Sequence, residues 1–255
     1  MPSNIIREYN ELYPRKELED FVASYWENKN LTEFPQEVTI CPDGYIKLIV
    51  QLKDHKIVAY FLTGIWAKEI DIIVPPGIIT YGIRFKIIAP EYILQREVSS
   101  LLNTVEQLNT SFFNIRNVEF STFSEIVDQF EYTILDRLPN ADEIKPNRLR
   151  LSQFLYSTYG DIQASEVAMQ IYWSQRTISR YLNKYIGISL KKYLNIQKCY
   201  RAYFQIRDGA FFPEKGFFDQ AHFIREVKKH TGHTPTQLHQ LQNDQFIQLK
   251  NMKKP

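Results

Sequence analysis

Two stretches of this chain, 45 residues apart, decide its fold class. The first is Ser174-Gln-Arg-Thr-Ile-Ser-Arg-Tyr-Leu-Asn-Lys-Tyr-Ile-Gly187-Ile-Ser189, and the second is Asp219-Gln-Ala-His-Phe-Ile-Arg-Glu-Val-Lys-Lys-His-Thr-Gly232-His-Thr234. They align without gaps. Each begins with Ser or Asp, which cap helix N-termini, and each reaches a Gly, which commonly ends a helix. The repeat therefore predicts two equivalent helices.

Each predicted helix has one apolar face and one polar face. Ile178 and Leu182 in the first copy, and Phe223 and Val227 in the second, are four residues apart, which is the spacing of a buried stripe. Arg can bind guanine through two acceptors, Gln or Asn can bind adenine, and Lys neutralises phosphate. The polar faces therefore predict DNA contacts from Gln175, Arg176, Ser179, Arg180, Asn183 and Lys184, and from Gln220, His222, Arg225, Lys228 and Lys229.

The neighbouring sequence completes a helix-turn-helix pattern. Residues 163–171 predict a short helix, which the Tyr172-Trp173 turn joins to the first repeat. Residues 190–208 also have helical spacing and would span about 28 Å. That length can set two reading helices close to one duplex turn apart, roughly 34 Å. The full set of helices expected after the Pro139-Asn140 break is 147–159, 163–171, 174–185, 189–207, 219–231 and 234–242, followed by a loose tail from residue 243.

Charge divides the chain at nearly the same place. Residues 1–145 contain 14 Lys and Arg against 22 Asp and Glu, a net charge of −8, whereas residues 146–255 contain 17 against 7, a net charge of +10. A basic domain of this size attracts a polyanion, and counterion release would make the binding depend on salt. We expect a mixed α/β sensor or dimerisation domain in residues 1–142 and a DNA-binding domain in residues 143–255.

Short β-branched and aromatic runs predict a small antiparallel sheet or barrel in the N-terminal half. The runs are 38–41, 45–52, 57–66, 70–74 and 78–88, with Pro42-Asp43-Gly44 read as a turn between two strands. Helices are expected around the sheet at 16–26, 98–109 and 119–138. The predicted fold class is an α+β domain followed by an all-α double helix-turn-helix domain. Four aromatic residues of the sheet are interpreted as core in preference to a ligand pocket: Tyr60, Trp66, Tyr81 and Phe85.

Residues from about 147 to 242 resemble the DNA-binding domain of AraC/XylS family transcription regulators. The resemblance rests on Gly216-Phe-Phe-Asp-Gln-Ala-His-Phe-Ile-Arg-Glu226 followed by Thr231-Gly-His-Thr-Pro235. It implies promoter binding and, commonly, activation of transcription. It also implies base reading at positions that match Arg176, Ser179 and Arg180 in the first unit and Gln220, Ala221, His222 and Arg225 in the second.

The N-terminal half resembles, less specifically, sensor-like domains found ahead of such units. The recognisable points are Cys41-Pro-Asp-Gly-Tyr45, Thr63-Gly64 and Tyr81-Gly-Ile-Arg-Phe85. This resemblance implies signal sensing or dimerisation in general terms. Besides double-stranded DNA, we expect RNA polymerase, a small-molecule effector and a second copy of the chain as partners.

The second unit departs from the family pattern. Its leading helix corresponds to Asp208-Gly-Ala-Phe-Phe-Pro213-Glu-Lys-Gly216, which is short and contains a proline. Phe211, Phe212, Phe217 and Phe218 are expected to supply the packing instead, and sequence reading is assigned first to Arg176 and Arg180. A second interpretation stays open, in which the helical domain binds a ligand or a protein and no longer reads DNA.

Other chemistries have little support in the sequence. The chain lacks G-x-S-x-G, G-x-x-x-x-G-K-[ST], G-x-G-x-x-G and H-E-x-x-H motifs, so we expect neither an enzyme nor a cofactor. His222, His230, His233 and His239 fit no zinc spacing, so we expect no metal. Cys41 and Cys199 are expected to be reduced thiols. The absence of a signal peptide and of a long apolar run predicts a cytoplasmic protein without a membrane span.

Overall fold

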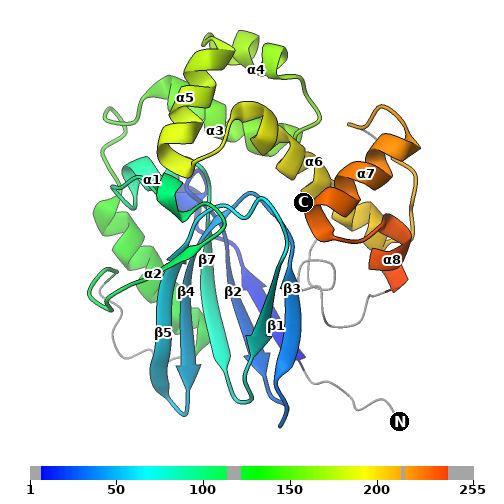
Figure 1. Ribbon diagram of the computed structural model, residues 1–255. Helices are drawn as coiled ribbons and strands as arrows, with labels where there is room; N and C mark the ends of the chain where they lie inside the picture. Colours follow the sequence, from blue (N-terminus) through cyan, green and yellow to red (C-terminus); the bar gives the residue numbers. More distant parts are fainter. Residues whose placement is uncertain (1–6, 114–121, 214–215, 241–255) are drawn as a thin grey trace.

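An antiparallel sheet region is followed along the chain by a helical region, and the computed structural model describes residues 7–113, 122–213 and 216–240 (Figure 1). Six strands form one sheet in the order β1-β2-β7-β4-β5-β8, and β3 pairs with β6 in a second sheet. The predicted fold class is therefore confirmed. The strands are β1 (Arg7–Leu12), β2 (Val22–Asn30), β3 (Gln36–Ile40), β4 (Ile46–Lys53), β5 (Lys56–Thr63), β6 (Ile70–Val74), β7 (Ile79–Phe85) and β8 (Val105–Gln107).

Helix α2 (Phe123–Arg137) packs on one face of the six-stranded sheet. It begins at a capping box, in which the Thr122 and Glu125 side chains each bond the other residue's backbone N–H. Tyr25 of β2 stacks on Phe130 of α2, with 6.3 Å between the ring centroids. The aromatic residues interpreted as core, Tyr60, Trp66, Tyr81 and Phe85, are all buried.

Two of the helices predicted around the sheet are wrong. Residues 16–26 contain only the 3-10 turn η1 (Lys16–Leu18) before β2 begins, and residues 98–109 contain the 3-10 turn η2 (Ser99–Leu101) and β8. Strand β2 lies between β1 and β7 and pairs with both, so tertiary pairing overrides the helical spacing. Its C-terminal half is polar yet buried, at Glu27, Asn28 and Asn30. The third predicted helix, 119–138, corresponds to α2, although residues 119–121 lie outside the described residues.

The first five helices of the C-terminal half agree with the predicted bounds to within one residue, and the sixth begins one residue after its predicted start, while its predicted end at residue 242 lies outside the described residues. These helices are α3 (Pro146–Thr158), α4 (Ala164–Ile171), α5 (Gln175–Ile186), α6 (Leu190–Arg207), α7 (Gln220–Thr231) and α8 (Pro235–Gln240). Residues 241–255, with the predicted loose tail, lie outside the described residues. Among the helices that are described, none is both long enough and apolar enough to cross a membrane.

One apolar core joins the sheet region to the helices. From the sheet region it includes Ile46, the first residue of β4, and Tyr45 just before it. From the helices it includes Leu155 of α3 and Tyr193 of α6. The predicted boundary after residue 142 falls between α2 and α3, and it stays a prediction because this core does not stop there. Cys41 and Cys199 are buried and form no disulfide, and both belong to a second, smaller apolar cluster around α7.

Candidate nucleic-acid interface

Helix α5 has the caps that its sequence predicts. The Ser174 hydroxyl accepts a hydrogen bond from the Thr177 backbone N–H at 3.0 Å. Gly187 ends the helix with φ of +77°, a left-handed conformation in which glycine carries no steric penalty. Ile178 and Leu182 are fully buried. The amphipathic helix predicted from the first repeat is therefore confirmed.

The predicted contact residues of α5 lie on its outer side, with one exception. Gln175, Arg176, Arg180, Asn183 and Lys184 are exposed. Ser179 is half-buried, and its hydroxyl accepts a hydrogen bond from the backbone N–H of Leu190 at 3.4 Å. Ser179 therefore also connects α5 to the start of α6.

Helices α4 and α5 form a helix-turn-helix pair. Val167 and Ile171 of α4 are fully buried, whereas Ala168 between them is half-buried. Tyr172 adopts the left-handed conformation, with φ of +58°, and thereby ends α4. The Trp173 ring then packs edge-on against Tyr181 of α5, at 6.0 Å between centroids. The predicted turn therefore aims the N-terminus of α5 away from the core.

Helix α7 repeats the construction of α5. The Asp219 carboxylate accepts a hydrogen bond from the His222 N–H at 2.7 Å, and Gly232 ends the helix with φ of +71°. Phe223 and Val227 are fully buried. The exposed predicted residues are Gln220, Arg225, Lys228 and Lys229.

His222 is held by its own helix terminus. It is half-buried, and its Nδ1 accepts a hydrogen bond from the Phe218 N–H at 3.3 Å. Its ring also lies edge-on to Phe217, at 5.7 Å between centroids. Both contacts orient the imidazole ring relative to the N-terminus of α7.

The second unit has no leading helix within residues 208–213 and 216–219, as its sequence predicts. Phe217 packs on Phe223, at 5.0 Å between ring centroids, and Phe211 packs on His239 at 5.2 Å. The expectation that four phenylalanines pack here is wrong for two of them, because Phe212 and Phe218 are 68% and 93% exposed. Residues from α6, α8 and the sheet region complete the cluster: Tyr203, Phe204, Leu238 and Cys41.

Helix α6 links the two units, with α5 and α7 at its opposite ends (Figure 1). Its 18 residues correspond to about 27 Å at the standard helical rise. Ten of its residues are buried, among them Tyr193, Gln197 and Tyr203. A helix that is buried to this extent can hold the two units at a constant separation.

A groove of about 350 Å³ runs beside α5. Three aromatic rings and three cations line it together with one hydroxyl: Trp173, Tyr181, Tyr185, Arg148, Arg180, Lys184 and Thr177. Arg148 of α3 forms an ion pair with Glu91 of α1 (Ala89–Tyr92) and lies over the Tyr181 ring, 5.4 Å from its centroid. The Lys184 ammonium lies 3.6 Å from the Glu97 carboxylate.

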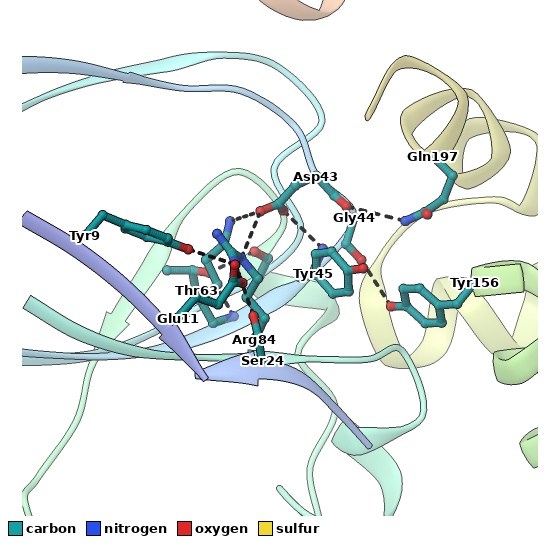
Figure 2. A network of polar contacts seen from close by, with 12 residues as sticks. Tyr9, Glu11, Ser24, Asp43, Gly44, Tyr45, Thr63, Arg84, Tyr156 and Gln197 are labelled. Carbon is teal, nitrogen blue, oxygen red and sulfur yellow. Dashed lines mark hydrogen bonds and ion pairs between the residues drawn. The ribbon is translucent and has the colours of Figure 1, made fainter. Parts of the chain in front are cut away.

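The turn at Asp43-Gly44 anchors the sheet region to the helices. The Tyr156 hydroxyl donates a hydrogen bond to the Gly44 carbonyl at 3.3 Å, and the Gln197 amide donates to the Asp43 carbonyl at 3.4 Å (Figure 2). The Tyr193 hydroxyl also donates to the Gly44 carbonyl, at 3.3 Å. Gly44 has φ of +79°, and a Cβ atom added there would lie 2.1 Å from Gln197 Nε2. Neither the backbone conformation nor the space suits a larger residue.

A row of buried polar side chains crosses the six-stranded sheet next to this turn. Ser24, Arg84, Lys47 and Thr63 occupy neighbouring register positions on β2, β7, β4 and β5. The Lys47 ammonium lies 2.7 Å from the Asp43 carboxylate. Arg84 pairs with Glu11 (Figure 2). Burial lowers the pKa of Lys47, while the Asp43 charge opposes that shift.

Sequence reasoning did not identify this buried charge cluster. The turn around Asp43 was predicted, and its carboxylate does accept a hydrogen bond from the Tyr45 N–H at 3.2 Å. The available signal was a charged residue inside each of two apolar strand patterns, at Lys47 and Arg84. Such residues are rarely buried unless they are paired, and only the strand register shows that these two are neighbours.

Comparisons with known proteins describe part of this architecture. Residues 10–107 match the model of a family described as "Domain of unknown function (DUF6597)". No curated protein matches the chain. Two similar solved structures are crystal structures of ToxT from Vibrio cholerae. One is a ligand-free point variant from strain SCE256, with 10% identity and a TM-score of 0.44 over 86% of this chain and 98% of that chain.

The other ToxT structure is from strain O395 and is bound to (E)-4-(8-methylnaphthalen-1-yl)but-3-enoic acid. It has 11% identity and a TM-score of 0.43 over 93% of this chain and 98% of that chain. At this identity and TM-score the likeness carries no functional information.

Proposed function

We propose that this protein is a sequence-specific transcription regulator of the AraC/XylS type that binds duplex DNA through α5 and α7. The observation that carries the proposal is the pair of glycine-ended amphipathic helices at the two ends of α6, each with an exposed basic and amide face. Arg176 and Arg180 would read bases from α5, whereas Lys184, Lys228 and Lys229 would chiefly contact phosphates.

The charge distribution supports duplex DNA as the ligand. Residues 146–255 carry a net charge of +10, whereas residues 1–145 carry a net charge of −8. A helix of 10–12 Å diameter fits the major groove of B-DNA, which is about 12 Å wide. Arg176 and Arg180 lie one helical turn apart on α5, so both can reach base edges from one insertion.

We further propose that the sheet region is a sensor for a small-molecule effector. Tyr25 of β2 faces α2, so its neighbours Ser24 and Trp26 project from the opposite face of the sheet. Lys47 lies in the same register row as Ser24 and therefore projects from that opposite face too. The buried Trp26 Nε1 atom has no hydrogen-bond acceptor among the described residues, whereas the buried Lys47 ammonium is paired with the Asp43 carboxylate. From the sequence resemblance alone, we also propose activation of transcription with RNA polymerase and action as a homodimer.

The deciding experiment is the selection of bound duplexes from a random pool by the purified protein at two salt concentrations. We expect an enriched motif that disappears in an Arg176→Ala/Arg180→Ala variant. A Lys53→Ala/Lys56→Ala variant, which removes two exposed cations from the end of β4 and the start of β5, is the matched control and should select the same motif. A failure of the wild-type protein to enrich any motif at either salt concentration would refute sequence-specific binding.

The second candidate function is a ligand- or protein-binding module that no longer reads DNA. The observation that favours it is confined to the second unit, where residues 208–213 and 216–219 contain no helix and His222 is held by Phe218. It predicts weak binding to duplex DNA that is indifferent to sequence. Retention of one promoter fragment from a genomic pool would exclude it.

A further inference from the structure

The groove beside α5 lies next to the proposed reading face and points in a different direction. Arg176, Arg180 and Asn183 define the reading face, whereas Tyr181 and Tyr185 lie roughly 150° around the helix from the centre of that face. Arg180 belongs to both surfaces, and Lys184 lies on α5 between them. The groove is therefore a continuation of the reading face and not a separate site.

A helix that fills the major groove has the two sugar-phosphate backbones at its sides. Because the major groove is about as wide as the helix, side chains beside the reading face meet the backbone of one strand. The groove offers that strand the cations of Arg148, Arg180 and Lys184 and the hydroxyl of Thr177. Its charge and composition match a phosphate backbone, to which such side chains commonly bond.

Two carboxylates of the acidic N-terminal half already form ion pairs with two of these three cations. Glu91 pairs with Arg148 and also accepts a hydrogen bond from the Tyr181 hydroxyl at 3.1 Å. Glu97 pairs with Lys184, and both side chains of this pair are about half exposed.

The backbone beside Glu97 is itself fastened to α5. The Val98 N–H donates a hydrogen bond to the Tyr185 carbonyl at 2.9 Å. A Cβ atom added to Gly187 would lie 2.6 Å from the Ser99 carbonyl oxygen, so the two segments are in close contact. The Glu97 carboxylate is thus held beside the groove by more than its own ion pair.

We propose that the groove binds the sugar-phosphate backbone of one DNA strand, and that Glu91 and Glu97 compete with this strand for Arg148 and Lys184. This inference rests on the proposed function, and it adds a restraint on DNA binding that is built into the contact between the acidic half and α5. A movement of the 97–99 segment away from α5 would release Lys184 and remove a negative charge from the path of the strand.

The test uses the full chain with Glu97→Gln, and Glu37→Gln as the matched control. Glu37 is an exposed carboxylate on β3, so both variants lose one negative charge from the same half. Binding of the selected duplex and of a random duplex is measured at several salt concentrations. Because exposed ion pairs of this kind are weak, we expect Glu97→Gln to tighten binding about two- to fivefold near 0.1 M salt. The gain should vanish near 1 M salt, where charges are screened within about 3 Å.

A Lys184→Met background tests whether Glu97 acts through Lys184. The gain from Glu97→Gln should shrink in this background, since the cation for which the carboxylate and the phosphate compete is gone. Equal gains in both backgrounds, or equal gains from Glu97→Gln and Glu37→Gln, would overturn the competition while leaving DNA binding intact. If the wild-type chain and every variant fail to bind duplex DNA at low salt, the proposed function fails and this inference fails with it.

Discussion

Replacement of Gly44 by alanine tests how firmly the sheet region is joined to the linker helix. The new methyl group would lie 2.1 Å from Gln197 Nε2, and the backbone would be held at φ of +79°. A non-glycine residue in the left-handed region costs about 1–2 kcal/mol. Overpacking in a closed core adds about 1–3 kcal/mol. Gln197 is fully buried and donates hydrogen bonds to Asp43 and Tyr193, so it cannot swing aside freely. We expect a total loss of about 2–5 kcal/mol in the free energy of unfolding.

Gly77→Ala is the matched control for this substitution. Gly77 also has a left-handed backbone, with φ of +72°, but a Cβ atom added there meets nothing within 4 Å. Its loss should therefore be limited to the conformational part, about 1–2 kcal/mol. Urea unfolding followed by the fluorescence of the buried Trp26 and Trp66 side chains measures both variants.

The double variant Gly44→Ala/Gln197→Ala checks the cause of the loss. Shortening Gln197 removes the atom that the new methyl group strikes, so the two substitutions together should cost about 1–3 kcal/mol less than the sum of their separate costs. Additive losses in the free energy of unfolding, or equal losses for Gly44→Ala and Gly77→Ala, would show that the turn at Gly44 is not tightly packed against Gln197 of α6. The reasoning that the two halves share one rigid contact would then be wrong.

Three further predictions concern DNA reading, pH and buried charge. Arg176→Ala should cost about 1–3 kcal/mol of binding free energy on the preferred duplex and relax sequence preference. Lys228→Ala should weaken binding to all duplexes alike, and competition binding between specific and random duplexes separates the two effects. Burial lowers the pKa of His230 below its ordinary value of 6.5, against the opposing charge of Glu226. The folded chain then binds fewer protons than the unfolded chain, so this contribution to stability is complete above pH 6.5 and is lost as the pH falls below it. Thermal unfolding at pH 5 and pH 7.5 should show that His230→Gln reduces this pH dependence. Lys47→Met should destabilise by about 3 kcal/mol, because it removes the nearer cation from the buried Asp43 carboxylate and leaves only Arg84, at 4.0 Å. Lys184→Met, which breaks an exposed pair, should cost less than about 1 kcal/mol, and the same urea titration compares them.

The helical half follows closely from local sequence. Caps such as Ser174 and Asp219, stop residues such as Gly187 and Gly232, and apolar pairs four residues apart each act within one or two helical turns. Such signals are complete within the segment that carries them. The predicted bounds of α3 to α7 therefore agree with the structure, and so does the missing leading helix of the second unit.

The sheet region was predicted less well because its signals depend on partners far along the chain. Strands β1 and β2 were missed, since β2 buries Glu27, Asn28 and Asn30 and does not alternate apolar with polar residues. A strand is readable from local sequence when apolar residues form a short run or alternate with polar ones, and the polar half of β2 does neither. Here the pairing with β1 and β7 determines the strand.

The sequence by itself determined the class of the molecule: a mixed sheet region, a basic helical domain with two equivalent amphipathic helices, and the residues on their outer faces. Only the tertiary structure decided how the two halves meet. It brings the Gly44 carbonyl onto Tyr156 and Tyr193, and it brings Glu97 beside Lys184. These contacts join residues that are separated by 87 to 149 positions. Their formation depends on how complete elements pack together, which no local pattern of residues records.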